Sequence, residues 1–128
     1  MQDLKIIIHG CPKTKKNHSQ IIKAGNKRRV IPSKQYRAFE ENFLADCMEQ
    51  RAWNKNIDYP VEIKCLYYMD TKRRVDLTNL LSATDDALQT ANVIVDDCST
   101  IVVSHDGSRV LYDKNNPRTE IYIKPYVE

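Results

Sequence analysis

The chain has 128 residues, of which 41% are hydrophobic and 29% are charged, and its formal net charge is +3. This length and composition fit one globular domain that buries its own core, so we predict a single domain over residues 1–128. No apolar run approaches the roughly 18 residues that span a bilayer, and the first residues lack the apolar core of a signal peptide. We therefore expect a cytoplasmic protein without contact to a membrane.

The charges are distributed unevenly along the chain. Residues 1–37 carry 10 Lys and Arg against one acid, whereas the rest of the chain carries 10 against 16. A basic first third beside an acidic remainder suits a protein that holds phosphates with one part and a metal with the other. A surface that is merely polarised would give the same charges, so on charge alone both interpretations stay open.

The first half of the chain predicts two strands, a hairpin and a helix. The apolar, β-branched run 4–9 predicts a buried strand. Residues 21–31 predict a β-hairpin around a Gly-Asn turn, with a basic tip. Aromatic and apolar residues at helical spacing predict an amphipathic helix over 33–51, with Ser33 as its N-cap. Alternation of apolar and charged residues then predicts a strand over 61–69.

The second half predicts one more helix and two more strands. The helix spans about 76–91, with an apolar arc built on leucines. Its opposite, polar arc holds Thr78, Asn79, Ser82, Asp85 and Asp86. Apolar runs predict strands over 101–103 and 119–124, with turn-forming residues between them. The predicted fold class is α+β, with a single mixed or antiparallel sheet and two main helices packed on it. The four cysteines form no Cys-x-x-Cys pair, which predicts reduced thiols rather than a zinc site.

Carboxylates flank the second predicted helix. Asp76 stands at its start, and Asp96-Asp97 end the apolar run that follows the helix. Each also has an ordinary structural explanation, Asp76 as an N-cap and the pair as a solvated turn. A helix of about 15 residues carries the chain roughly 22 Å, so the pair rejoins Asp76 only if residues 93–95 run back along the helix.

Carboxylates that converge would suit phosphodiester hydrolysis. Mg²⁺ or Mn²⁺ prefers hard carboxylate oxygens, and such a metal ion activates water and neutralises developing negative charge. Lys and Arg nearby would hold the phosphates of a nucleic acid. The candidate phosphate contacts are Lys13, Lys15, Lys16, Lys27, Arg28, Arg29, Lys72, Arg73 and Arg74.

The block from Asp76 to Asp97 resembles the signature of the RusA-type Holliday junction resolvases. The matching residues are Asp76-Leu77-x-Asn79-Leu80, Asp86-Ala87-Leu88 and Val93-Ile94-x-Asp96-Asp97, after the basic run Lys72-Arg73-Arg74. The resemblance implies a RusA-like fold and a small homodimeric endonuclease, frequently carried on prophages. Such an enzyme cuts branched DNA at four-way junctions by two symmetric nicks, using Mg²⁺ or Mn²⁺. Carried over by position, the resemblance makes Asp76 and Asp97 metal-binding, Asp96 a further catalytic acid, and Asn79 and Asp86 supporting residues.

Two positions depart from the pattern that the resemblance implies. Thr78 stands where a second aspartate is expected, and Ser82 where a lysine is expected. The two positions lie about 40° apart around a helix, so both changes fall on one face. We hypothesise that Asp96 or Asp86 supplies the missing ligand, and that Lys16, Lys72 or Arg73 supplies the missing cation. The alternatives are a weakly active or non-catalytic DNA-binding module, and a nuclease that acts on flaps or linear duplex.

Overall fold

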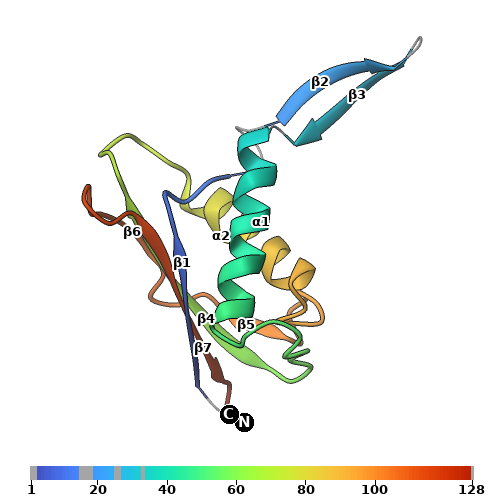
Figure 1. Cartoon of the computed structure of the whole chain (residues 1–128). Helices are drawn as coiled ribbons and strands as arrows, with labels where there is room; N and C mark the ends of the chain where they lie inside the picture. Colours follow the sequence, from blue (N-terminus) through green and yellow to red (C-terminus); the bar gives the residue numbers. More distant parts are fainter. Residues whose placement is uncertain (1–2, 15–18, 25–26, 33, 128) are drawn as a thin grey trace.

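A computed structural model describes residues 3–14, 19–24, 27–32 and 34–127 (Figure 1). The described residues form seven strands and two helices. In chain order they are β1 (Leu4–His9), β2 (Ser19–Ala24), β3 (Lys27–Pro32), α1 (Lys34–Glu49), β4 (Val61–Met69), α2 (Leu77–Thr90), β5 (Val102–Ser104), β6 (Arg109–Tyr112) and β7 (Arg118–Pro125). Within these ranges, no helix has the length and apolarity that crossing a membrane requires.

Five strands form one mixed sheet, in which the last strand takes an inner place. β7 pairs antiparallel with β1 on one side and with β4 on the other. β4 also pairs in parallel with β5 near its first residues and with β6 near its last. β2 and β3 form a separate antiparallel ribbon, which projects away from the sheet at the start of α1 (Figure 1). The predicted α+β class is confirmed, with the hairpin as an addition to the main sheet.

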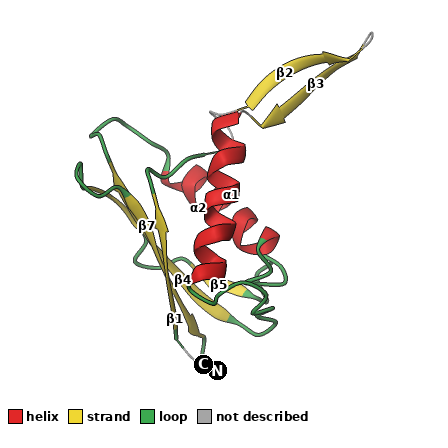
Figure 2. Ribbon diagram, viewed as in Figure 1, coloured by secondary structure: helices red, strands yellow, loops and turns green. Residues whose placement is uncertain are grey.

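Both helices cover the same face of the sheet, and the hydrophobic core lies between them and the strands (Figure 2). The strands contribute fully buried side chains such as Ile6, Ile63 and Ile121. The helices contribute Phe43 from α1 and Leu88 from α2 to the same cluster. Burying a side chain of this size stabilises the fold by about 1.5–3 kcal/mol. The leucine-rich arc predicted for the second helix therefore faces this core.

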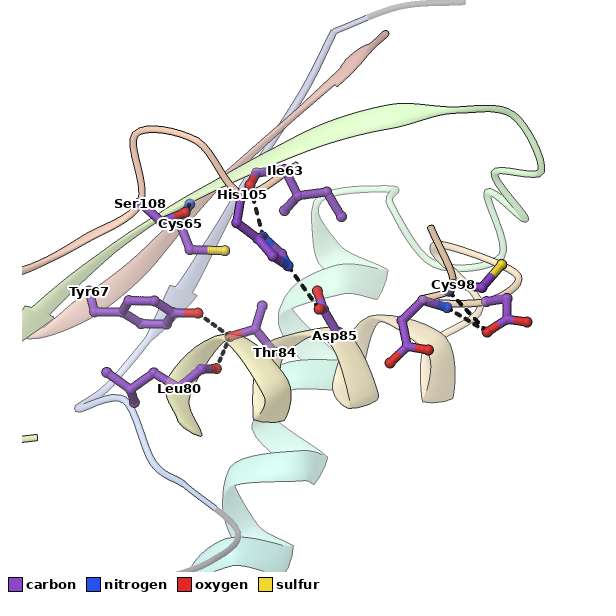
Figure 3. Close-up of polar contacts among 11 residues, drawn as sticks. Ile63, Cys65, Tyr67, Leu80, Thr84, Asp85, Cys98, His105 and Ser108 are labelled. Carbon is purple, nitrogen blue, oxygen red and sulfur yellow. Dashed lines mark hydrogen bonds and ion pairs between the residues drawn. The ribbon is translucent and has the colours of Figure 1, made fainter. Parts of the chain in front are cut away.

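One polar chain crosses the core between β4 and α2. The Thr84 hydroxyl lies 2.9 Å from the Leu80 carbonyl oxygen and 2.7 Å from the Tyr67 hydroxyl (Figure 3). A carbonyl oxygen only accepts, so Thr84 donates to Leu80 and Tyr67 donates to Thr84. Tyr67 is 1% exposed, so this bond satisfies a hydroxyl that water does not reach.

Side chains of α1 and of Gln50, the residue after it, form hydrogen bonds with the free edge of β1. The Gln50 amide accepts from Ile7 N at 2.7 Å and donates to Ile7 O at 2.6 Å, as a neighbouring strand would. One turn earlier, the Asp46 carboxylate accepts from His9 N at 2.9 Å, and Asn42 donates to His9 O at 2.8 Å. An unpaired edge is a template for association with another chain, and these amides and carboxylate occupy most of it.

Two side chains also replace ladder bonds on β4 between the stretches that pair with β5 and β6. His105 Nδ1 lies 3.0 Å from Ile63 O, and Ser108 Oγ accepts from Cys65 N at 2.9 Å (Figure 3). The turn between them needs Gly107, whose φ is 85°. A Cβ at that position would also lie 2.9 Å from Lys64 Cδ. The turn predicted at residues 105–108 is thus the link that joins two short edge strands.

Most predicted elements are confirmed with shifts of one to three residues. The strand 4–9 and the strand 61–69 match β1 and β4, and the second helix begins at Leu77 with Asp76 as its cap. β6 was not predicted from the sequence. The proposed cap Ser33 and the turn residues 25–26 lie outside the described residues. All four cysteines are free, in agreement with the predicted thiols.

Candidate active site

Asp76 caps α2 and keeps one oxygen free of that role. Its backbone is extended, and Oδ1 accepts from Thr78 N at 2.9 Å and from Asn79 N at 3.4 Å. The predicted N-cap role is therefore confirmed, and it uses Oδ1 alone, since Oδ2 has no partner among the described residues. Asp76 is exposed, as are the three basic residues before it, Lys72, Arg73 and Arg74.

Asp96 and Asp97 lie in an exposed turn beyond the other end of α2. Residues 93–95 pair with Ile57, through Ile57 N to Val93 O at 2.9 Å and Val95 N to Ile57 O at 3.1 Å. Asp96 Oδ1 then accepts from Asp97 N at 2.7 Å and from Cys98 N at 3.3 Å, which shapes the turn. The Asp97 carboxylate accepts no hydrogen bond from the described residues.

Asp97 lies near carboxylates of α2 and of its own turn, and Asp76 is not among the groups that affect its pKa. Burial and the carboxylates of Asp85, Asp96 and Asp86 raise the pKa of Asp97, so this residue lies in the negative field of the second half of α2. Asp85 is nine residues beyond Asp76, about 14 Å along a helix axis. The described residues contain no group of three His, Cys, Asp or Glu side chains that could hold a metal ion. Residues 93–95 pair with Ile57, and the turn that follows them places Asp97 in the field of Asp85 and Asp86 on α2.

Asp85 pairs with His105, and sequence reasoning missed both residues. His105 Nε2 lies 2.9 Å from Asp85 Oδ2, while Nδ1 contacts the Ile63 carbonyl (Figure 3). A carbonyl and a carboxylate both only accept, so both ring nitrogens carry protons and the ring is cationic. The hydrogen bond to Asp85 accordingly raises the pKa of His105. The Asp85 side chain is 13% exposed, which corrects its assignment to the polar face of the helix.

The second carboxylate oxygen of Asp85, Oδ1, does not take part in the pair with His105. Asp85 Oδ1 is buried and has no hydrogen-bond partner. A buried oxygen without a donor costs about 1–3 kcal/mol, which an ion pair with His105 offsets in part. Asp85 and the exposed acids Asp86, Asp96 and Asp97 together give an excess of negative charge near the second half of α2. Hard, anionic oxygen donors of this kind fit Mg²⁺ or Mn²⁺.

The remaining predicted residues fall into two groups. Lys13 is half-buried, Asn79 is half-buried in the first turn of α2, and Asp86 is exposed on its third turn. The departures Thr78 and Ser82 are both exposed on α2. In β3, the positions of Lys27, Arg28 and Arg29 pair with Ala24, Lys23 and Ile22. Lys15 and Lys16 lie outside the described residues.

A family model described as Endodeoxyribonuclease RusA matches residues 9–124. The chain belongs to the RusA endodeoxyribonuclease family. At the level of this family, it is an endonuclease that acts on Holliday junctions. No curated protein matched the chain. The RusA match covers the basic run, α2 and the Asp96-Asp97 turn together, so it includes every acid of the predicted centre.

Proposed function

We propose that this RusA-family chain is a metal-dependent, structure-selective endonuclease that resolves four-way DNA junctions by paired symmetric nicks. The family match supports the substrate class. The observation that supports the finer proposal is that Asp76, at the start of α2, and Asp97, in the turn after it, are exposed acids that share no metal-holding group of three within the described residues of one chain. Neither makes a complete metal site alone, and the substrate has two scissile strands related by symmetry. A DNA substrate also agrees with the predicted cytoplasmic location.

A homodimer is the arrangement in which these two acids meet. In a two-fold dimer, any contact made by one copy's residue with a residue of the other occurs twice. If Asp76 of one copy lies beside Asp97 of a second copy, two equivalent centres form, each with carboxylates from both chains. This geometry supplies one centre for each strand of a four-way junction, and it accounts for the incomplete acid set of one chain.

Each residue has a definite part in the proposed reaction. Asp97, Asp96 and Asp76 from the second copy would hold Mg²⁺ or Mn²⁺, with Asp86 as a nearby supporting acid. When bound, this ion supplies a nucleophilic water and stabilises charge on the phosphate. The exposed cations Lys72, Arg73 and Arg74 precede Asp76 directly, so they hold the phosphates next to the scissile one. Lys13 and the hairpin positions 27–29 contact the arms further away.

A cleavage assay with Asp76→Asn and Asp97→Asn tests this proposal. Asn caps a helix as well as Asp does, so Asp76→Asn keeps the cap and removes the charge that holds a metal. We expect each variant to keep junction binding and to lose Mg²⁺-dependent cleavage by at least about 100-fold. Glu49→Gln, which removes an exposed acid of α1, is the matched control. Unchanged cleavage in both aspartate variants would overturn the proposed centre.

The substrates in that assay separate the alternatives. A four-way junction, a flap and a linear duplex of the same sequence are compared at equal salt, because salt alone changes affinity for DNA. Preference for the junction supports the proposal. Equal cutting of all three would make the chain a general nuclease. Binding without cutting in either Mg²⁺ or Mn²⁺ would make it a DNA-binding module, which the replacement of charged residues by Thr78 and Ser82 would then explain.

A further inference from the structure

An open hollow lies between the end of β1 and the first turns of α1. Its volume is about 440 Å³, and all the residues that line it belong to the described part of the chain. The lining is His9, Gly10, Cys11, Lys13, Gln35, Ala38, Phe39 and Asn42. None of these is an aspartate or a glutamate. No acid of the candidate active site lines this hollow, and of the predicted phosphate contacts Lys13 lines it.

His9 is held in one orientation at the wall of the hollow. Its ring nitrogen Nδ1 lies 3.1 Å from Asp46 Oδ1, and the same carboxylate accepts from His9 N through Oδ2. A carboxylate accepts, so Nδ1 carries a proton. Nε2 is left for another partner, and it donates to a phosphate oxygen in the form of the ring that carries a proton on both nitrogens. Among the described residues nothing bonds to Nε2, and the His9 side chain is 64% exposed. Asp46 thus presents the far side of the imidazole outward.

The charge of the hollow suits an anion. Lys13 contributes a cation. Two acids bond to lining residues from outside: Asp46, which is 6% exposed and occupied by β1, and the exposed Asp70, which accepts from Cys11. A second hollow of about 420 Å³ provides a contrast on the sheet. That one is lined by Lys5, Lys64 and Lys124 together with Asp3, Glu62 and Asp106, so its charges balance. The hollow at α1 differs in that its lining combines a cation and an imidazole with no carboxylate of its own.

The lining of this hollow is partly apolar, and one of its residues contacts the segment that leads to Asp76. Phe39 and Ala38 present carbon surface beside the polar groups. Cys11 Sγ donates to Asp70 Oδ1 at 3.3 Å, which joins the hollow to the connector that leads to Asp76. The ribbon of β2 and β3 starts on the same side of the molecule (Figure 1). A ligand with one phosphate and one flat or sugar-like apolar part matches this combination.

We propose that this hollow binds one nucleotide of the DNA substrate, with its phosphate at Lys13 and His9 and its sugar and base against Phe39. The proposal rests on the proposed function, since it gives the substrate a second contact outside the acid centre. His9 and Asp46 act in binding here and take no part in the bond that is cut. An unstacked nucleotide near a branch point would fit more readily than one inside a continuous duplex, because its base is free to stack on a side chain.

Junction binding by Ala38→Glu tests the hollow without removing any existing contact. Ala38 and Ala45 are both exposed on α1, but only Ala38 lines the hollow, so Ala45→Glu is the matched control. In EDTA and about 0.1 M salt, we expect Ala38→Glu to weaken binding by about tenfold, the effect of one lost phosphate contact. The slope of log affinity against log salt should fall by about one. Ala38→Lys should bind as tightly as wild type or more tightly. Equal affinities of the two Glu variants would overturn the proposal.

A dinucleotide separates this proposal from the proposed function. Thymidylyl-thymidine contains one phosphodiester, and we expect its addition to shift the imidazole NMR signals of His9 in wild type and not in Ala38→Glu. The signals of His105, which is held by Asp85, serve as an internal control in the same spectra. If wild type does not cut junctions but the His9 signals shift, the proposed function fails and the hollow stands. If wild type cuts junctions and these signals stay unchanged, the hollow fails alone.

Discussion

His105 joins the turn after β5, the carbonyl of Ile63 and the carboxylate of Asp85 in one contact (Figure 3). The cationic ring lies beside an end of α2 where four carboxylates gather. Its charge offsets part of that of Asp85, the carboxylate that acts most strongly on Asp97. This pair fastens the helix to the sheet close to the turn that carries two of the candidate ligands.

The pKa of His105 predicts how stability changes with pH. The hydrogen bond to Asp85 raises this pKa above the unfolded value of about 6.5. The pair therefore stabilises the fold fully below about pH 6.5, and the stabilisation disappears as pH rises through the native pKa. Urea unfolding at about pH 6 and pH 8 should show this loss in wild type and a flatter dependence in His105→Gln. The raised pKa of Asp97 lowers stability as the pH rises above the unfolded carboxyl pKa of about 3.9, so it does not contribute to the change between about pH 6 and pH 8.

That prediction has a clear contrary outcome. A His105→Gln variant whose unfolding free energy varies with pH as strongly as that of wild type would show that another group titrates. His9→Gln is the matched control, because its ring is 64% exposed whereas that of His105 is 23% exposed. We expect His9→Gln to keep the wild-type dependence above about pH 6.5.

The buried hydroxyls of Tyr67 and Thr84 predict unequal costs for two similar substitutions. Tyr67→Phe removes a donor and leaves Thr84 bonded to Leu80, so it should cost about 1 kcal/mol of unfolding free energy. Thr84→Val removes an acceptor and leaves the Tyr67 hydroxyl buried without a partner, which costs about 1–3 kcal/mol. The double variant should cost less than the sum of the two. Strictly additive values in urea unfolding would contradict this bonding scheme.

At the residue scale, the sequence predicted roles better than it predicted partners. Asp76 was recognised both as a cap and as a candidate ligand, because its position before an apolar helix is a local property. Asp85 was assigned to the polar face of α2, since its partner His105 comes twenty residues later on a different element. Periodicity describes the faces of one helix and says nothing about a turn that the fold brings against it.

The edge of β1 shows how one element protects another. Asn42 and Asp46 of α1 and Gln50, the residue that follows this helix, bond to the backbone of Ile7 and His9. Such a helix replaces a neighbouring strand without continuing the sheet. It also fixes the end of β1, from which the chain enters the basic loop and the hollow beside His9.

Gln50→Ala should therefore weaken the fold and expose a strand edge. The Ile7 N–H and C=O lose partners at 2.7 and 2.6 Å, and we expect a loss of about 2 kcal/mol in unfolding free energy. The open edge should also increase self-association at high concentration. Urea unfolding and light scattering measure the two effects, with Glu49→Ala as the control for an exposed neighbour. A variant with wild-type stability and scattering would show that water serves this edge equally well.

Elements with a strong internal pattern were predictable, and β6 was not. The period of two in β4 and the helical period in α2 depend on neighbours in sequence. β6 has four residues, and it exists because Leu66 to Met69 of β4 pair with it in parallel. The mixed character of the sheet comes from the same long-range pairing. The placement of the Asp96-Asp97 turn was also beyond reach, because it depends on residues 93–95 pairing with Ile57.

At the scale of the whole molecule, mixing two inactive variants tests whether a centre is shared between copies. In a dimer of one Asp76→Asn chain and one Asp97→Asn chain, a shared arrangement leaves one centre intact and damages the other twice. Mixing should therefore restore cleavage at roughly a quarter of the wild-type number of centres. The product should be a junction nicked on one strand, since only one centre per dimer is active.

The contrary result is equally definite. If Asp76 and Asp97 of the same chain formed a centre, every centre in the mixture would lack one acid, and no cleavage would return. A mixture of Asp76→Asn with Glu49→Gln should keep half of the wild-type number of centres with or without exchange of subunits, so it controls for the effect of mixing itself. Size-exclusion chromatography with light scattering at the assay concentration gives the number of copies.

The inner place of β7 determines when this protein folds during its synthesis. β7 is the last strand along the chain, yet both β1 and β4 bond to it (Figure 1). Until residues 118–125 have left the ribosome, these two earlier strands have no common neighbour, and the sheet has a gap at its centre. Pairings between distant parts of a chain also form slowly. Folding of the sheet is therefore a late, cooperative event, and a nascent chain that stalls before β7 would expose two unpaired strands to chaperones and proteases.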